Sequence, residues 1–146
     1  MMLFIDANIW CYYFDARHPE HEQVKIFMRQ ALLSERLAVN TLIVIEVAHY
    51  LNRNLSRDDA RKRTENLLTL ENLHVHDFDR EQLLKSLDLL NRYSSSHGLG
   101  GRDATIISTV KSQGIDCLVT HDRALEHVAK LESVDVVDPV QGLEKR

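Results

Sequence analysis

Four acidic residues in this sequence stand at positions where their charge suggests chemistry. Asp6 and Asp122 come directly or closely after short apolar runs, Asp103 follows a glycine-rich stretch, and Glu46 is flanked by Ile45 and Val47. If they converge, such carboxylates repel one another unless a cation compensates them, and a hard divalent cation does so through oxygen coordination. The carboxylates therefore suggest a Mg²⁺ or Mn²⁺ site, whereas Zn²⁺ would call for more His or Cys ligands.

Each of these residues also has a purely structural explanation. Aspartate is favoured at helix N-termini and in turns that follow strands, which could account for Asp6, Asp103 and Asp122. Glu46 lies in an apolar segment, where a buried salt bridge could satisfy its charge. The coincidence of four carboxylates is stronger evidence for a metal site than any one of them.

Alternating apolar runs and helical patterns predict the elements that would position these side chains. The predicted strands are Leu3–Ile5, Leu37–Val39, Leu73–Val75, Cys117–Val119 and Val134–Val137. Six helices are predicted. The first follows Pro19, the second begins at Asn40 or Thr41, the third begins near Ser56, the fourth runs from Asp79 to Ser94, the fifth leads up to Gly114, and the sixth runs from Asp122 to Leu131. This alternation predicts one three-layer α/β/α domain over residues 1–146, with a mostly parallel central sheet of about five strands.

Open parallel sheets bind ligands beyond the carboxyl ends of their strands, and the predicted elements place all four carboxylates at that edge. Asp6, Ala7 and Asn8 are expected to leave the first strand as a loop. Two helices are expected to bury regular apolar stripes, which consist of Leu42, Ile45, Ala48 and Leu51 in one and Leu83, Leu84, Leu87, Leu90 and Tyr93 in the other. Residues 94–101 are expected to form a flexible run.

Composition narrows the class of protein. The net charge of −4 argues against a protein that coats polyanions over its whole surface, although a local basic patch stays possible. Cys11 and Cys117 have no metal-ligand spacing and are expected to be reduced core thiols. The chain shows no signal peptide and no apolar run long enough for a membrane span, so we expect a cytoplasmic protein without membrane association.

Four short motifs resemble those of the PIN-domain nuclease family. They are Phe4–Asn8, Ile43–Val47, Gly101–Ala104 and Val119–Asp122, and their order spans nearly the whole chain. The chain looks most like the VapC-type toxins of toxin-antitoxin systems. This resemblance implies a PIN-like fold and a Mg²⁺- or Mn²⁺-dependent endoribonuclease that hydrolyses RNA phosphodiester bonds.

The resemblance also implies roles and partners. Asp6, Glu46, Asp103 and Asp122 would be the catalytic metal ligands, and three polar residues would orient them: Asn8, Thr41 and Thr120. The toxin would belong to a type II toxin-antitoxin pair, with a small antitoxin protein as partner, and is expected to form a homodimer.

Residues outside the motifs are candidates for RNA contacts. Arg102 lies beside the expected pocket and Arg123 follows its last carboxylate, so both could meet phosphate. Four aromatic residues follow Asp6 and could stack a base, although core packing or a dimer surface explains them better: Trp10, Tyr12, Tyr13 and Phe14.

Two other functions use the same sheet edge. A receiver-type phosphoacceptor signalling domain would need paired acids after the first strand and a late pocket lysine, whereas Lys111 and Lys130 fall inside predicted helices. A catalytically idle PIN-like module that binds RNA or protein would not need all four acids. The metal-dependent nuclease is the function that uses every carboxylate.

Overall fold

The computed structural model describes residues 1–140 and contains, within that range, five strands and seven helices. The strands are β1 (Met2–Ile5), β2 (Arg36–Asn40), β3 (Leu73–His76), β4 (Cys117–Val119) and β5 (Asp135–Val137). The helices are α1 (Ala7–Phe14), α2 (His21–Ser34), α3 (Thr41–Asn54), α4 (Arg57–Leu68), α5 (Arg80–His97), α6 (Gly101–Ser112) and α7 (Arg123–Leu131).

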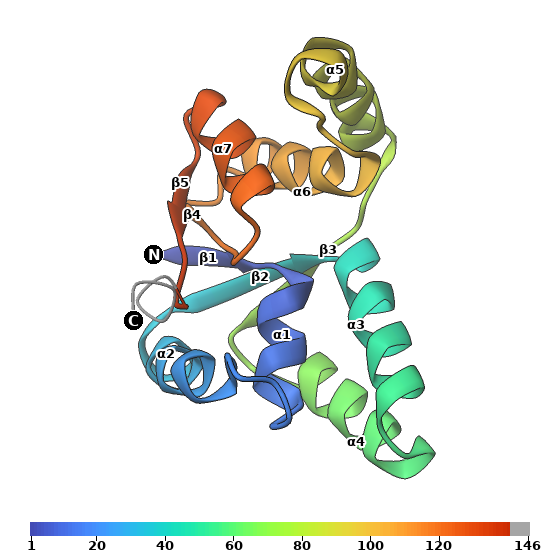
Figure 1. Ribbon diagram of the computed structural model, residues 1–146, viewed down its shortest axis with the longest axis vertical. Coiled ribbons are helices and arrows are strands. Elements are labelled where there is room, and N and C mark those ends of the chain that lie inside the picture. The colour runs from blue at the N-terminus through green and yellow to red at the C-terminus, as the bar shows by residue number, and fades with distance from the viewer. Residues whose placement is uncertain (141–146) are drawn as a thin grey trace.

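The five strands form one fully parallel sheet with the order β3-β2-β1-β4-β5. Helices α1 to α4 cover one face of this sheet and α5 to α7 cover the other, as Figure 1 shows. The three-layer α/β fold predicted from the sequence is therefore confirmed. The chain leaves the central strand β1 toward β2 and returns on its other side at β4, so β1 and β4 border the switch point where open sheets bind ligands.

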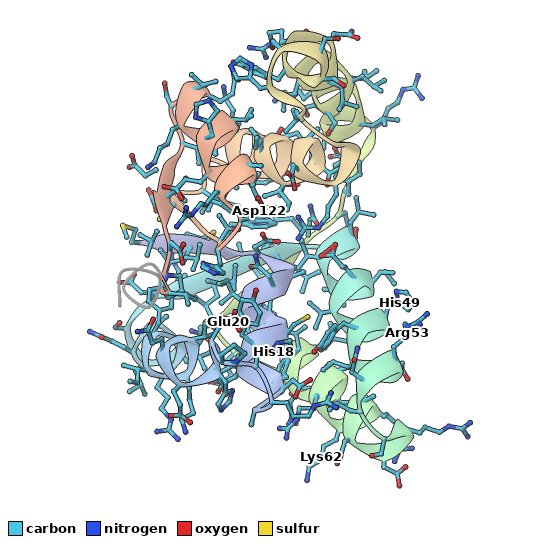
Figure 2. All side chains as sticks on the ribbon, viewed as in Figure 1. His18, Glu20, His49, Arg53, Lys62 and Asp122 are labelled. Atoms are coloured by element: carbon cyan, nitrogen blue, oxygen red, sulfur yellow. The ribbon has the colours of Figure 1, made fainter. Side chains whose placement is uncertain are left out.

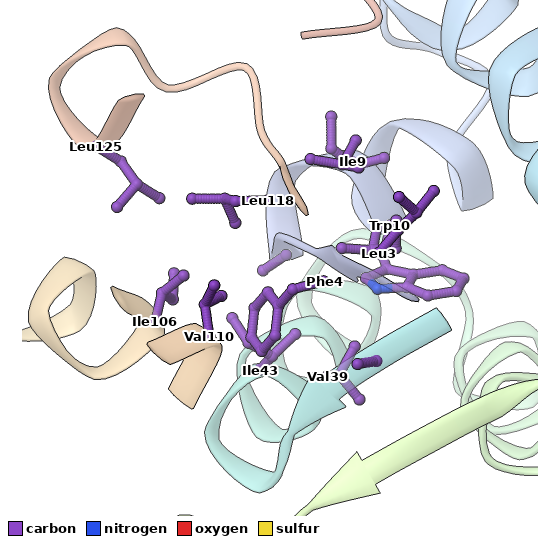
Figure 3. Packing of buried hydrophobic residues seen from close by; sticks show 14 of the residues in the cluster. Leu3, Phe4, Ile9, Trp10, Val39, Ile43, Ile106, Val110, Leu118 and Leu125 are labelled. Carbon is purple, nitrogen blue, oxygen red and sulfur yellow. The ribbon is translucent and has the colours of Figure 1, made fainter. Parts of the chain in front are cut away.

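Strand β1 is the centre of the hydrophobic core. Leu3, Phe4 and Ile5 are buried, because a parallel strand with helices over both faces has no side exposed to solvent. Figure 3 shows Phe4 in the middle of the cluster, with Ile43 of α3 and Val110 of α6 around it. The strand that ends at Asp6 is thus held from both helical layers.

Helix α1 occupies residues for which the sequence suggested a loop. Asp6 caps this helix, because one of its carboxylate oxygens accepts a hydrogen bond from the backbone N–H of Ala7. The helix then buries apolar side chains on several sides, including Ile9 and Trp10. The prediction of a loop was wrong because a helix buried nearly all round shows little polar-apolar alternation.

Two helices were predicted correctly, but the predicted buried stripe of each is only partly right: Leu51 of α3 is buried, and Leu90 and Tyr93 of α5 are partly buried against the core. Helix α3 buries Ile43, Val47 and Leu51, while Leu42 and Ile45 are 43% and 69% exposed. In α5 the exposed side chains include Leu83, Leu84 and Leu87, and the buried ones are Gln82, Ser86 and Leu89.

Helix α5 also continues three residues beyond the predicted end. It runs through residues expected to be flexible and stops at Gly98, whose φ of +66° provides the left-handed C-cap. Within residues 1–140, no helix is both long and apolar enough to span a membrane.

Candidate active site

All four predicted carboxylates lie at the carboxyl edge of the sheet. Asp6 caps α1 directly after β1, and Asp122 caps α7 shortly after β4. Glu46 lies in the second turn of α3, and Asp103 lies in the first turn of α6. Figure 2 labels Asp122 between α7 and the sheet.

The guanidinium of Arg102 connects three of these carboxylates. Its Nε donates to Glu46 Oε1, its Nη2 donates to Asp6 Oδ1, and its Nη1 donates to Asp103 Oδ1 at 2.9 Å. Burial alone would lower the pKa of Arg102, but the hydrogen bonds and charges of Glu46 and Asp6 outweigh it and raise that pKa. The sequence suggested Arg102 as an RNA contact beside the pocket, whereas the structure places it inside the pocket.

Asp6 is the most enclosed of the acids, with none of its surface exposed. Its second oxygen, Oδ2, accepts a hydrogen bond from the Thr120 hydroxyl at 2.7 Å, so both oxygens are oriented. Burial raises the pKa of Asp6 above its ordinary value, although Arg102, Thr120 and the Ala7 N–H act in the opposite direction. A neighbouring cation is therefore needed to stabilise the ionised carboxylate of Asp6 in the protein interior.

Asp122 lies close enough to influence Asp103. Burial, and next to it the charge of Asp122, raise the pKa of Asp103. Asp122 also accepts hydrogen bonds from the backbone N–H groups of Ala124 and Leu125 at 2.9 and 3.1 Å, which is the capping role considered from the sequence. Asp122 thus caps α7 and also lies near Asp103.

The residues expected to orient the carboxylates differ in their contacts. Thr120 lies beside Asp6, and its Oγ1 also accepts from the Asp122 N–H at 3.1 Å. Thr41 instead accepts from the backbone N–H of Phe78 at 3.2 Å, so its observed bond connects α3 to the segment before α5. The Oδ1 atom of Asn8 is buried and has no hydrogen-bond partner among residues 1–140. Arg123 is exposed on the first turn of α7.

The donor set fits a hard divalent cation. Three carboxylates from separate elements direct oxygens at one cationic group, and Asn8 adds an unused buried carbonyl oxygen nearby. In the described residues, no three His, Cys, Asp or Glu side chains are arranged so as to hold one ion, and Arg102 forms ion pairs with Asp6, Glu46 and Asp103 instead. A metal ion would therefore have to replace at least part of the Arg102 contacts.

The carboxylates continue into a cavity that the sequence did not predict. This cavity has a volume of about 260 Å³ and extends from Glu46 and Arg102 to Tyr12, His18 and Tyr50. Tyr50 lies four residues after Glu46 on α3, so helical spacing could have identified it. His18 lies in the connection between α1 and α2 and gave no such signal.

Cys11, which also lines this cavity, is no candidate nucleophile. Burial, and then the charges of Glu46 and Asp6, raise the pKa of its thiol to about 12. Such a thiol stays protonated at neutral pH, and thiolate is the reactive form. Both cysteines are buried and free, as the sequence predicted.

A larger cavity of about 600 Å³ lies between α1, α2 and α4, apart from the carboxylates. Tyr13 and Phe14 line it on the side of α1, and Lys25, Arg29 and Arg63 give it a basic rim. The aromatic run after Asp6 is thus divided: Tyr12 faces the carboxylate cavity, Tyr13 and Phe14 face the basic one, and Trp10 is buried in the core.

The fold is similar to that of several solved structures. One is Mycobacterium tuberculosis VapC20, a sarcin-ricin-loop-cleaving toxin, with a TM-score of 0.72, 17% identity and coverage of 86% of this chain and 94% of that one. FitAcB from Neisseria gonorrhoeae gives 0.70 at 20% identity, covering 95% and 98% of the two chains. DNA-bound VapBC from Salmonella typhimurium gives 0.72 at 15% identity, with the same coverage of 95% and 98%.

No curated protein sequence matches this chain. At these low identities the solved structures establish the fold and leave the family to be decided by sequence. The model of the PIN domain matches residues 3–131, a range that contains all four carboxylates, Arg102 and Thr120. Sequence and architecture therefore agree that the chain belongs to the PIN-domain family.

Proposed function

We propose that this protein is a Mg²⁺- or Mn²⁺-dependent endoribonuclease that acts as the toxin of a type II toxin-antitoxin pair. The observation that carries the proposal is the convergence of Asp6, Glu46 and Asp103 on one cationic group at the switch point of the sheet. Three carboxylates around one cation can supply the protein ligands of a divalent ion that also binds a phosphate. Membership of a nuclease family supports the same chemistry.

Asp6, Glu46 and Asp103 would hold the ion, with Asp122 beside them. When bound, a divalent ion can neutralise the scissile phosphate and lower the pKa of a water molecule for in-line attack. The Thr120 hydroxyl fixes the orientation of Asp6, and the free Oδ1 of Asn8 can accept a hydrogen bond from water or RNA. Arg102, once released from the carboxylates, would be available to a phosphate oxygen.

The partners follow from the same proposal. A structure of similar fold from Klebsiella pneumoniae is described as a toxin-antitoxin complex, which supports a small antitoxin as the partner of this chain. The basic cavity between α1, α2 and α4 offers Lys25, Arg29 and Arg63 to an acidic segment of such a partner. RNA is the proposed substrate, and a toxin of this kind would act in the cytoplasm.

The test is cleavage of end-labelled structured RNA with and without Mg²⁺ or Mn²⁺, using wild type, Asp6→Asn, Asp103→Asn and Asp58→Asn. Asp58 is an exposed acid in the first turn of α4 and serves as the matched control. We expect metal-dependent cleavage that falls by more than about 100-fold in the two pocket variants, since charge stabilisation at the phosphate is lost. The Asp58 variant should cleave like wild type.

Circular dichroism of every variant separates loss of activity from loss of fold. Equal cleavage by folded wild type and both pocket variants would refute the site. Absence of cleavage by the wild type on a broad set of RNAs would instead favour the idle binding module.

A further inference from the structure

The cavity that begins at the carboxylates continues as a trench between α1 and α3. Cys11 and Tyr12 form one wall, one helical turn beyond Asn8, and Tyr50 forms the other wall, one turn beyond Glu46. One turn of helix advances about 5–6 Å, so the far end of the trench lies about one nucleotide from the carboxylates. The atoms that face the trench are mostly apolar, in contrast to the charged end.

Three rings close the far end of the trench. The Tyr12 and His18 rings meet edge to face with centroids 5.0 Å apart, and the His18 and Tyr50 rings are tilted by 33° at 5.7 Å. All three side chains are partly exposed and line the cavity. Aromatic faces next to a phosphate-binding site are the usual platform for an unpaired nucleobase.

A buried carboxylate holds two of these rings in place. The Tyr50 hydroxyl donates to Asp15 Oδ2 at 2.8 Å and accepts from His18 Nε2. Asp15 is buried and is itself held by Arg17, whose Nε and Nη2 donate to its two oxygens at 2.9 and 2.7 Å. The rings are therefore oriented before any ligand binds, which lowers the entropy cost of binding.

This hydrogen-bond pattern leaves one ring atom of His18 available. Because the Tyr50 hydroxyl donates to Asp15, it accepts from Nε2 of His18, and Nδ1 of His18 has no hydrogen-bond partner among residues 1–140. In the tautomer with the proton on Nε2, Nδ1 is an acceptor. An acceptor at the edge of a stacking site can receive an N–H of a base or a 2′-hydroxyl. The trench thus combines an apolar floor, ring faces and a polar edge.

We propose that this trench is a nucleobase-binding subsite, in which an unpaired base of the nucleotide next to the scissile phosphate packs against Tyr12 and Tyr50 beside His18. This inference rests on the proposed function, because it takes the carboxylates as the place of the scissile phosphate. It identifies single-stranded RNA, or an extruded base, as the class of substrate that the site accepts.

The trench is less suited to the other ligands that a nuclease meets. A second phosphate would need a second cation, and among the described residues that line the trench Arg102 is the one Lys or Arg, which the proposed function already assigns to the scissile phosphate. The Cys11 thiol stays neutral and adds no charge. A volume of about 260 Å³ is small even for a drug-sized ligand, for which sites span roughly 300–1,000 Å³, and it suits one planar group.

Binding of a labelled single-stranded RNA of about 12 nucleotides, measured by fluorescence anisotropy, tests the subsite. The measurement uses Asp103→Asn protein with Mg²⁺, so that binding is read without cleavage, and compares this RNA with one whose central nucleotides are abasic. Tyr12→Leu is introduced into this background, and Tyr13→Leu is the matched control because the adjacent Tyr13 faces the basic cavity. A separate cleavage assay of the wild type tests the proposed function independently.

We expect Tyr12→Leu to weaken binding of the normal RNA by about 5- to 100-fold, the usual range for loss of one stacked base. The same substitution should change binding of the abasic RNA by less than about 2-fold, and Tyr13→Leu should leave both affinities unchanged. Equal losses on both RNAs, no loss on either, or no RNA binding at all would overturn the subsite. A subsite confirmed by binding, together with a wild type that does not cleave, would refute only the nuclease proposal.

Discussion

The side chain of Arg102 gives the pocket a cation of its own. Asp6 is fully buried and depends on this cation, while Glu46 and Asp103 share it. Replacing Arg102 by Met should leave the charges of the carboxylates uncompensated. In the absence of divalent ions, the free energy of unfolding should fall by about 1–3 kcal/mol, which is less than for a fully buried ion pair because the arginine is partly exposed. Mg²⁺ or Mn²⁺ should then raise the melting temperature of the variant more than that of the wild type, in which the ion competes with the guanidinium.

Differential scanning fluorimetry across a metal titration measures this effect independently of catalysis. Arg53→Met is the control, because Arg53 extends outward from the last turn of α3, away from the pocket, as Figure 2 shows. Its metal response should match that of the wild type. If the Arg102 and Arg53 variants respond equally to the ions, the guanidinium does not compete with a metal.

For individual residues, the sequence predicted the positions of the acidic side chains better than the positions of the side chains that contact them. Asp6 and Asp103 could be placed because a strand end and a helix start determine where a short side chain lies. The position of Arg102 could not be predicted, because a long side chain next to an acid can turn into the pocket or toward solvent. The contacts of Asp15 depend on Tyr50, 35 residues away in sequence, and no local pattern records them.

Helix α5 is attached to the rest of the fold through a buried polar network. The Thr109 hydroxyl of α6 donates to Gln82 Oε1 of α5 at 2.6 Å and accepts from the amide of Asn40, the cap of α3, at 3.0 Å. Thr109→Val preserves the shape but removes the hydrogen bonds of two buried atoms, Gln82 Oε1 and Asn40 Nδ2. We expect the free energy of unfolding to fall by about 2 kcal/mol in urea denaturation.

Thr64→Val provides the comparison for this network. Among residues 1–140, the Thr64 hydroxyl donates only to the carbonyl of Ala60 in its own helix, so its loss should cost less than about 1 kcal/mol. A Thr109 variant as stable as the Thr64 variant would show that the network contributes little.

The same network explains why the buried face of α5 was not predicted. A hydrophobic pattern assigns the leucines of a helix to the interior, but Gln82 and Ser86 are buried here together with Leu89, because partners on α6 satisfy the two polar side chains. The existence and the approximate bounds of most elements follow from local patterns, whereas the choice of face in α3 and α5 depends on what packs against them. The missed helix α1 has the same origin, since its polarity pattern reflects burial on several sides.

On the scale of the whole molecule, helices α3 and α5 expose leucine and isoleucine side chains on the surface. Helix α3 begins directly after β2 and α5 begins soon after the neighbouring strand β3, so both start at one corner of the sheet. Their exposed apolar side chains are Leu42, Ile45, Leu83, Leu84 and Leu87. Exposed apolar side chains at one corner of a sheet are candidates for an interface, and the homodimer expected from the sequence is the occupant we propose.

Ile45→Lys tests this assignment through the mass of the protein in solution. Ile45 is 69% exposed, so a lysine costs the monomer little, but in a two-fold interface the charge is introduced twice and buried. We expect sedimentation velocity to find a dimer for the wild type and mainly monomer for the variant. Leu33→Lys, on α2 and 90% exposed, should remain dimeric. A wild type that sediments as a monomer at all concentrations would remove the homodimer and leave this corner, which borders the carboxylate edge, to the antitoxin or to RNA.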